Sequence, residues 1–146
     1  MISSVLEQQT RDSIARQPLL RLYGAEVQSL ESGYIEIKVP VKDFMLRTAG
    51  IVNGGVLAAL ADSAAGYALS TLDEQLPYLL TIEFKINFLV AAKGDTILAT
   101  GRVLKNGGTL GVAQADLFML YEGNRTLAAT ALVTLIKTQN HGSSNS

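Results

Sequence analysis

The longest apolar stretch of the chain lies at its centre, between Gly50 and Leu72. It reads GIVNGGVLAALADSAAGYALSTL, and its many Ala and Leu residues predict a helix that begins at the glycine pair Gly54 and Gly55. Apolar residues cover nearly every side of this helix, which is typical of a helix buried inside a protein. Its single carboxylate, Asp62, is therefore expected to be buried, either hydrogen-bonded for structural reasons or kept for chemistry.

Before the central helix, the pattern predicts one helix and one hairpin. Ser4 and Glu7 have the spacing of a capping box, and helical periodicity then continues to about Arg16, before Pro18 discourages it. Alternating apolar and polar residues further along predict a half-buried antiparallel hairpin. Its strands are expected at Ala25 to Leu30 and Tyr34 to Val39, followed by a connection from Lys42 to Thr48.

After the central helix, four segments have the composition of strands, and Gly- and Asn-rich joints separate them as in hairpins. The predicted strands are Leu79 to Val90, Thr96 to Lys105, Leu110 to Tyr121 and Thr126 to Lys137. We expect them to form a four-strand antiparallel meander. The fold class is therefore α+β, a curved antiparallel sheet wrapped around one long helix, in one domain over residues 1–146. An N-terminal helix within residues 1–20 and a flexible tail at 138–146 complete the prediction.

Composition excludes several classes of protein. With 48% hydrophobic and 17% charged residues, the chain has the make-up of a globular protein, and its net charge of -1 with scattered basic residues argues against nucleic acid or an anionic membrane as a partner. The chain has no cysteine, which excludes disulfides and thiolate nucleophiles and fits a reducing compartment. The first residues lack a signal-peptide pattern, and the polar residues around Asp62 make the central helix a poor membrane span. We therefore expect a cytoplasmic protein without membrane contact.

The single histidine, His141, lies in the polar tail, so a His-based triad or a metal site is not expected in the folded part. Acid and base chemistry must then come from carboxylates, hydroxyls, amides and lysines.

The start of the central helix has the features of a carbonyl-binding site. The first N–H groups of a helix have no partner within the helix and lie at its positive end. Gly54 and Gly55 let a substrate carbonyl approach these groups, because no Cβ stands in the way. Asn53 adds an amide that can donate to the same oxygen or cap the helix.

The spacing of these groups predicts a site shared between two chains. Asp62 follows Gly54 by eight residues, which places them about 12 Å apart along one helix. One chain cannot hold a single carbonyl between them. Two chains with antiparallel central helices can, because Gly54 of one then faces Asp62 of the other. Apolar surface on Tyr67, Leu69 and the last strands also favours association, so we expect a homodimer, and beyond it a dimer of dimers that forms a homotetramer.

The segment GIVNGGVLAALADSAAGYAL resembles the signature of the hotdog-fold acyl-CoA thioesterases of the phenylacetate-degradation (PaaI-like) and 4-hydroxybenzoyl-CoA thioesterase-like groups. That signature is two glycines after a histidine, then an apolar stretch and a carboxylate, and the similarity covers about Leu22 to Lys137. The resemblance implies a hydrolase that cleaves a small, medium-chain or aryl acyl-CoA thioester.

The resemblance also implies roles for single residues. Gly54 or Gly55 would polarise the thioester carbonyl, Asp62 would act as general base or nucleophile, and Thr81 would position the attacking water. Where the family often has histidine, this chain has Asn53, whose amide donates hydrogen bonds but does not titrate near neutral pH.

Coenzyme A would be part of the substrate, so no separate cofactor is implied. The expected substrate contacts are Val56, Lys85, Lys105, Gly107 and Gly108. From the residues alone, Gly107 and Gly108 fit a hairpin turn better than a phosphate loop, because no helix follows them.

Three other readings stay open. The chain can be a hotdog protein that binds an acyl-CoA or lipid without turnover, a structural dimerisation domain, or a dehydratase or hydratase. The last normally needs a histidine partner.

Overall fold

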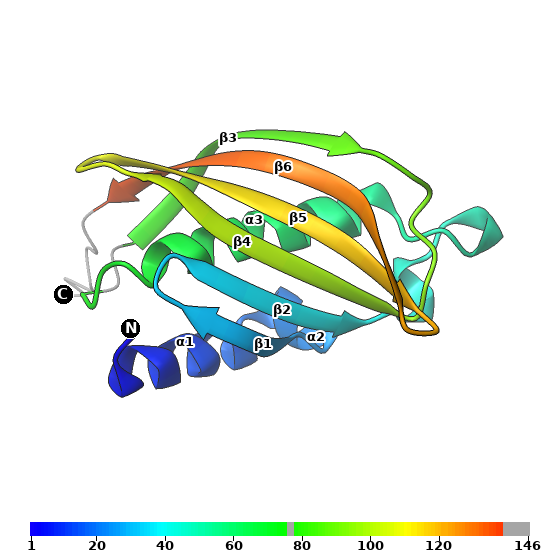
Figure 1. Cartoon of the computed structure of the whole chain (residues 1–146), viewed down its shortest axis with the longest axis horizontal. Coiled ribbons are helices and arrows are strands. Elements are labelled where there is room, and N and C mark those ends of the chain that lie inside the picture. The colour runs from blue at the N-terminus through cyan, green and yellow to red at the C-terminus, as the bar shows by residue number, and fades with distance from the viewer. Residues whose placement is uncertain (76–77, 139–146) are drawn as a thin grey trace, which may run out of the picture.

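The computed structural model describes residues 1–75 and 78–138. Two helices lead into two strands, two short 3-10 helices, one long helix and four strands (Figure 1). The elements are α1 (Ser4–Arg16), α2 (Pro18–Tyr23), β1 (Glu26–Glu31), β2 (Tyr34–Pro40), η1 (Asp43–Met45), η2 (Thr48–Gly50), α3 (Gly54–Ser70), β3 (Tyr78–Phe88), β4 (Thr96–Asn106), β5 (Leu110–Tyr121) and β6 (Asn124–Thr138).

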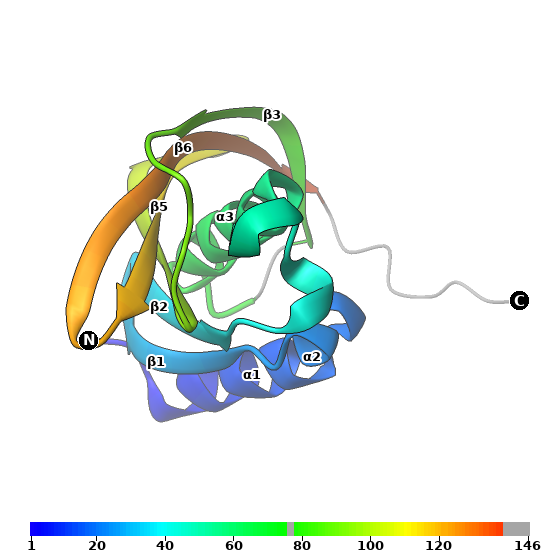
Figure 2. The ribbon, with the colours of Figure 1, turned by 90° about the vertical axis from the view of Figure 1, so that its right-hand side faces the viewer.

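The strands form one antiparallel sheet in the order β1-β2-β4-β5-β6-β3. Viewed from its end, the sheet curls around α3, which lies in its concave face (Figure 2). The predicted curved sheet around one long helix is confirmed. The described residues include no helix of the length and apolarity that crossing a membrane requires.

The predicted meander is wrong for its first strand. β3 pairs with β6, and β4 pairs instead with β2 and β5. The joint at Lys93 to Asp95 is therefore no hairpin turn. The backbone of this connection bonds to other parts of the fold, since Val52 N–H donates to the Ala92 carbonyl at 2.8 Å and Val41 N–H to the Asp95 carbonyl at 2.9 Å. These bonds hold the segment between β3 and β4 in place across the end of the sheet. The hairpins predicted between the first two strands and between the last three are present. The last turn is tighter than predicted, because β6 begins at Asn124 rather than at Thr126.

Small residues let α3 lie close to the sheet. A Cβ on Gly101 of β4 would overlap the carbonyl oxygen of Ala64, and one on Gly111 of β5 would overlap the side chain of Leu69. Alanines dominate the buried side of the helix and the facing strands, so backbone and methyl groups fill the space between them. This contact fixes the position of α3 along the sheet.

The N-terminal region departs from the prediction in two ways. The cap of α1 is Ser3 rather than Ser4, because the Ser3 hydroxyl accepts a hydrogen bond from the Leu6 N–H at 3.2 Å. A second helix, α2, begins at Pro18, where the sequence predicted only an end. Proline is well suited to the first position of a helix, since its missing N–H would have no partner there. Gly24 ends α2 in the left-handed conformation, with φ 73°.

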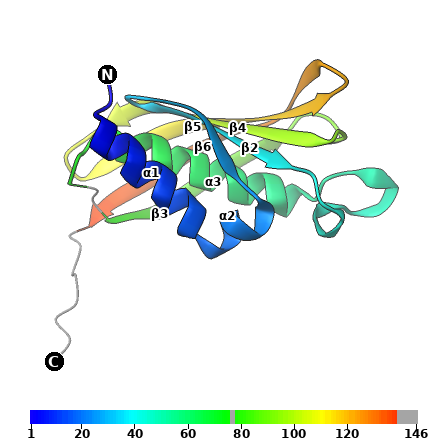
Figure 3. The ribbon, with the colours of Figure 1, turned by 90° about the horizontal axis from the view of Figure 1, so that it is seen from below.

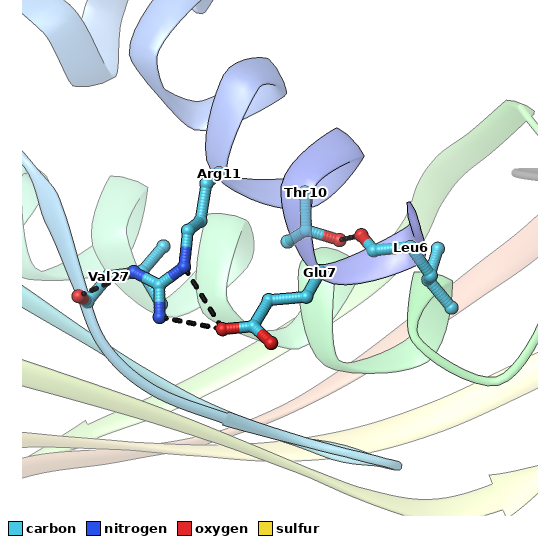
Figure 4. Close-up of polar contacts among 5 residues, drawn as sticks. All are labelled: Leu6, Glu7, Thr10, Arg11 and Val27. Atoms are coloured by element: carbon cyan, nitrogen blue, oxygen red, sulfur yellow. Dashed lines mark hydrogen bonds and ion pairs between the residues drawn. The ribbon is translucent and has the colours of Figure 1, made fainter. Parts of the chain in front are cut away.

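Helix α1 is fixed to the edge of the sheet. The Arg11 guanidinium donates to the Val27 carbonyl on β1 at 3.3 Å and pairs with Glu7 at 3.1 Å (Figure 4). Thr10 turns back and donates to the Leu6 carbonyl at 2.9 Å. Seen from below, α1 lies in front of α3, and the hydrogen bond between Ser13 and Tyr67 joins the two helices (Figure 3).

Candidate active site

The N-terminus of α3 leaves one backbone donor for a ligand. Asn53 caps the helix, and its side-chain oxygen accepts the Gly55 N–H at 2.8 Å. Among the described residues, the Gly54 N–H has no hydrogen-bond partner. The Asn53 side chain thus serves as a cap. In the part of the chain that the structure describes, the Gly54 N–H is unpaired, whereas that of Gly55 is paired.

An aromatic ring lies beside this donor. A Cβ on Gly54 would be 3.1 Å from the ring of Phe88, at the end of β3, and the Phe88 side chain is itself 53% exposed. The ring forms an apolar wall next to the Gly54 N–H. Nothing in the sequence pattern distinguishes Phe88 from an ordinary strand residue, so sequence reasoning missed it.

The second part of the site is a hydroxyl–carboxylate pair. The Thr81 hydroxyl on β3 donates to Oδ1 of Asp62 on α3 at 2.5 Å. The bond joins residues nineteen positions apart, because the sheet curls around α3 and brings β3 into contact with the helix. Within the described part of the chain, Asp62 makes no ion pair, and Oδ2 has no hydrogen-bond partner. One carboxylate oxygen is held, and the other can accept a proton from a bound water or attack a substrate.

Asp62 lines a cleft of about 390 Å³ between α1, α3, β3 and the end of β6. The prediction that α3 is buried on every side, with Asp62 inside, is wrong. The helix is half-exposed at Asp62, Ser63, Gly66 and Tyr67, because the curled sheet leaves this side open. The carboxylate therefore keeps contact with solvent.

The expected substrate contacts do not gather around this cleft. Val56 is buried in the core, and Lys85 is exposed on the outer face of the sheet, opposite Leu132 of β6. Lys105, Gly107 and Gly108 lie at or beside the β4–β5 hairpin, past the point where β5 packs against the C-terminal end of α3. The reading of Gly107 and Gly108 as a hairpin turn is confirmed.

The described residues offer no cluster of three or more His, Asp or Glu side chains that would hold a metal ion. The tail with His141 lies outside the described residues.

Comparison with known proteins shows the family of the chain. The model of the family described as "Thioesterase superfamily" matches residues 49–120, which contain α3, Asp62 and Thr81. A protein from Saccharolobus solfataricus, provisionally named an esterase, is 32% identical over 128 residues, which cover 88% of this chain and 83% of the relative. The chain belongs to the thioesterase superfamily.

Solved structures of the superfamily share the fold. A thioesterase family protein from Silicibacter pomeroyi is 36% identical, with a TM-score of 0.86 over 90% of this chain and 96% of that one. The PaaI protein of Escherichia coli has a TM-score of 0.82 at 20% identity, over 94% and 96% of the two chains. The resemblance to hotdog-fold thioesterases is confirmed. Another relative, the E. coli protein named medium/long-chain acyl-CoA thioesterase YigI, is 25% identical over 71% of this chain and 77% of its own.

Proposed function

We propose that this protein is an acyl-CoA thioesterase whose active site combines Asp62 and Thr81 of one chain with Gly54 of a second. The observation that carries the proposal is the pairing of a solvent-accessible carboxylate with a threonine hydroxyl in a cleft. The carboxylate lies on the helix whose first N–H has no hydrogen-bond partner among the described residues. The superfamily assignment supports thioester hydrolysis, and the name of the YigI relative supports coenzyme A as the thiol part.

Asp62 can act in hydrolysis of the thioester by either of two routes. As a general base, Asp62 takes a proton from water while the water oxygen bonds to the thioester carbon, and the carbonyl oxygen becomes an oxyanion. As a nucleophile, a carboxylate oxygen of Asp62 bonds to that carbon directly, and water then cleaves the resulting anhydride. In both routes the C–S bond breaks, and the thiolate of coenzyme A leaves and is protonated. Thr81 holds one carboxylate oxygen in place throughout.

Gly54 stabilises the oxyanion. Its N–H lies at the positive end of α3, and a backbone donor fixed in this way gains strength as charge develops on the carbonyl oxygen. The ring of Phe88 adds an apolar surface beside this donor.

Pairing of two chains brings these groups together. β3 is an edge of the sheet, eleven residues long, with exposed apolar side chains such as Leu80 and Ile82. The opposite edge, β1, is shorter and is covered by α1 through Arg11. A long uncovered apolar edge is a template for a second strand, so two copies pair through β3.

The twofold axis of such a pair passes near the middle of β3. Gly54 lies beside Phe88 at one end of the strand, and Asp62 lies beside Thr81 toward the other. Antiparallel pairing of β3 with its copy therefore sets Gly54 of the partner against Asp62. Within one chain, eight helical residues keep Gly54 and Asp62 about 12 Å apart. In the pair, the partner's Gly54 takes the place beside Asp62 instead.

The proposal predicts that Asp62→Asn abolishes turnover. Released coenzyme A thiol is measured for wild type and variant with short-chain, medium-chain, long-chain and aryl acyl-CoAs. We expect kcat to fall at least about a hundredfold, because the amide keeps the shape of the side chain and removes its basicity.

Asp116→Asn is the matched control. Asp116 also accepts a hydrogen bond from a threonine hydroxyl, that of Thr130 at 2.7 Å, but on the outer face of the sheet. It should keep wild-type turnover. Equal activity of the two variants would remove Asp62 from the mechanism. Thermal stabilisation by acyl-CoA without any turnover by wild type would instead identify a binding protein.

A further inference from the structure

Strand β3, at the edge of the sheet, carries two opposite charges close together (Figure 1). Glu83 and Lys85 are its only charged residues, and both are exposed. Phe84 and Ile86, which alternate with them, pack against the core, so both charges lie on the outer face of the sheet. Among the described residues, neither charge forms an ion pair, and their neighbours on β6 are uncharged. The two side chains are therefore available to a second strand.

Pairing of β3 with its own copy allows only certain registers. Residues directly opposite each other in an antiparallel pair share a face, so the twofold axis passes between a residue and its own copy. The shared site also requires the partner's Phe88, beside Gly54, to lie near Thr81. A pair centred on Phe84 meets this requirement, since Phe84 is three residues from Thr81 and four from Phe88.

The two charges distinguish this register from the adjacent ones. With Phe84 at the centre, Glu83 lies opposite the partner's Lys85, and Lys85 lies opposite the partner's Glu83. Moving the centre by one residue sets Glu83 opposite its own copy in one direction and Lys85 opposite its own copy in the other. Opposite charges directly across an antiparallel pair stabilise it, whereas like charges destabilise it. The charge pattern therefore favours the register centred on Phe84 and disfavours both of its neighbours.

We propose that two copies of the chain pair through β3 with Phe84 at the twofold axis, and that reciprocal ion pairs between Glu83 and Lys85 fix this register. The inference rests on the proposed function, because that function requires a second copy at this edge. Glu83 and Lys85 are then positioning residues, which act by aligning Gly54 of one chain with Asp62 of the other. A slip to an adjacent register moves the two strands by two residues, or about 7 Å, and separates the halves of the site.

The register can be measured by cross-linking, because the chain has no cysteine of its own. Glu83→Cys and Lys85→Cys are prepared separately, dissociated, mixed, reassociated and oxidised. We expect the disulfide-linked dimer to contain one chain of each variant, since only the unlike positions face each other. Disulfides between two copies of the same variant would place the axis at that residue and overturn the inference. Absence of any disulfide in mixed dimers verified by native mass spectrometry would also overturn it.

Charge reversal provides a second test. Glu83→Lys and Lys85→Glu should each raise the dissociation constant of the dimer about tenfold or more, because two attractive pairs become two repulsive ones. The two variants should associate with each other as tightly as wild type does, and so should two copies of the chain that carries both substitutions. Lys38→Glu, the same change of charge at an exposed position of β2, should leave the dissociation constant unchanged.

Thiol release from acyl-CoA separates this inference from the proposed function. Turnover that is lost in each single charge variant and recovered in their mixture would support both. Equal dissociation constants for all charge variants, with wild-type turnover, would overturn the inference and leave the proposed function intact. A disulfide between positions 83 and 85 in a protein whose wild type hydrolyses no acyl-CoA would do the reverse.

Discussion

At the scale of single residues, Tyr34 combines partial burial with a hydrogen bond to the neighbouring carboxylate of Glu36. Burial raises the pKa of Tyr34 from 10.0 to about 12, and its hydrogen bond to Glu36, at 2.6 Å, acts in the same direction. The Arg102 guanidinium, 4.8 Å from the centre of the ring, opposes the shift. The phenol is therefore favoured over the phenolate on this face of the sheet.

This shift predicts a pH dependence of stability. In the unfolded chain Tyr34 loses its proton near pH 10.0, whereas in the folded chain it keeps it to about pH 12. Its contribution is complete below pH 10.0 and is lost as the pH rises toward 12. The difference in urea midpoint between wild type and Tyr34→Phe should therefore shrink across that window. A difference that stays constant with pH would contradict the assignment, and Tyr121→Phe serves as the reference variant.

Residues of the candidate site were predictable where the helix itself brings them together. Asn53, Gly54 and Asp62 follow from helix spacing and capping rules, whereas the role of Thr81 came from family resemblance. Ser13 and Phe88 were missed, because they reach the site through contacts with α1 and β3 that no local pattern records. Tyr67 was noted only as apolar surface, although its spacing from Ser63 already places both on one side of the helix.

At the scale of elements, the first turn of α3 carries a prediction of its own. Gly54 is the first residue of the helix, and Asn53 before it is extended, with φ -60° and ψ 134°. Both features suit proline at position 54. Gly54→Pro should therefore fold while it removes the proposed oxyanion donor, and kcat should fall about a hundredfold or more.

Gly54→Ala is the matched control for this experiment. It adds a Cβ that meets the same Phe88 ring at 3.1 Å but keeps the N–H. Circular dichroism and thiol release are measured for both variants. If alanine and proline reduce turnover equally, the effect is steric and the Gly54 N–H is not the donor.

The sequence predicted most helices and strands and which side of each strand is buried, but it did not predict every pairing between strands. Alternation shows which side of a strand is buried, and it does not show which strand lies next to it. The position of β3 beside β6 depends on the connection at 89–95. This connection bonds to β6, to β5 and to residues 41 and 52 in the segment between β2 and α3, and all of these partners are distant in sequence. Helix α2 was missed because Pro18 was read as the end of one helix rather than the start of the next.

At the scale of the whole molecule, the two edges of the sheet have different roles. Helix α1 covers β1 and forms one wall of the cleft, while β3 remains uncovered in the described residues. The same strand supplies Thr81 and Phe88, so the edge proposed for pairing is also part of the site. Association and catalysis are therefore expected to be lost together when the chains separate.

The composite site is tested most directly by mixing two inactive chains. Gly54→Pro and Asp62→Asn are dissociated, combined in equal amounts and reassociated, with mixed dimers verified by native mass spectrometry. Each mixed dimer contains one site with intact Gly54 and intact Asp62. Since half of the dimers are mixed and half of their sites are intact, we expect about a quarter of wild-type thiol release. No recovery in verified mixed dimers would contradict the account and place the whole site within one chain.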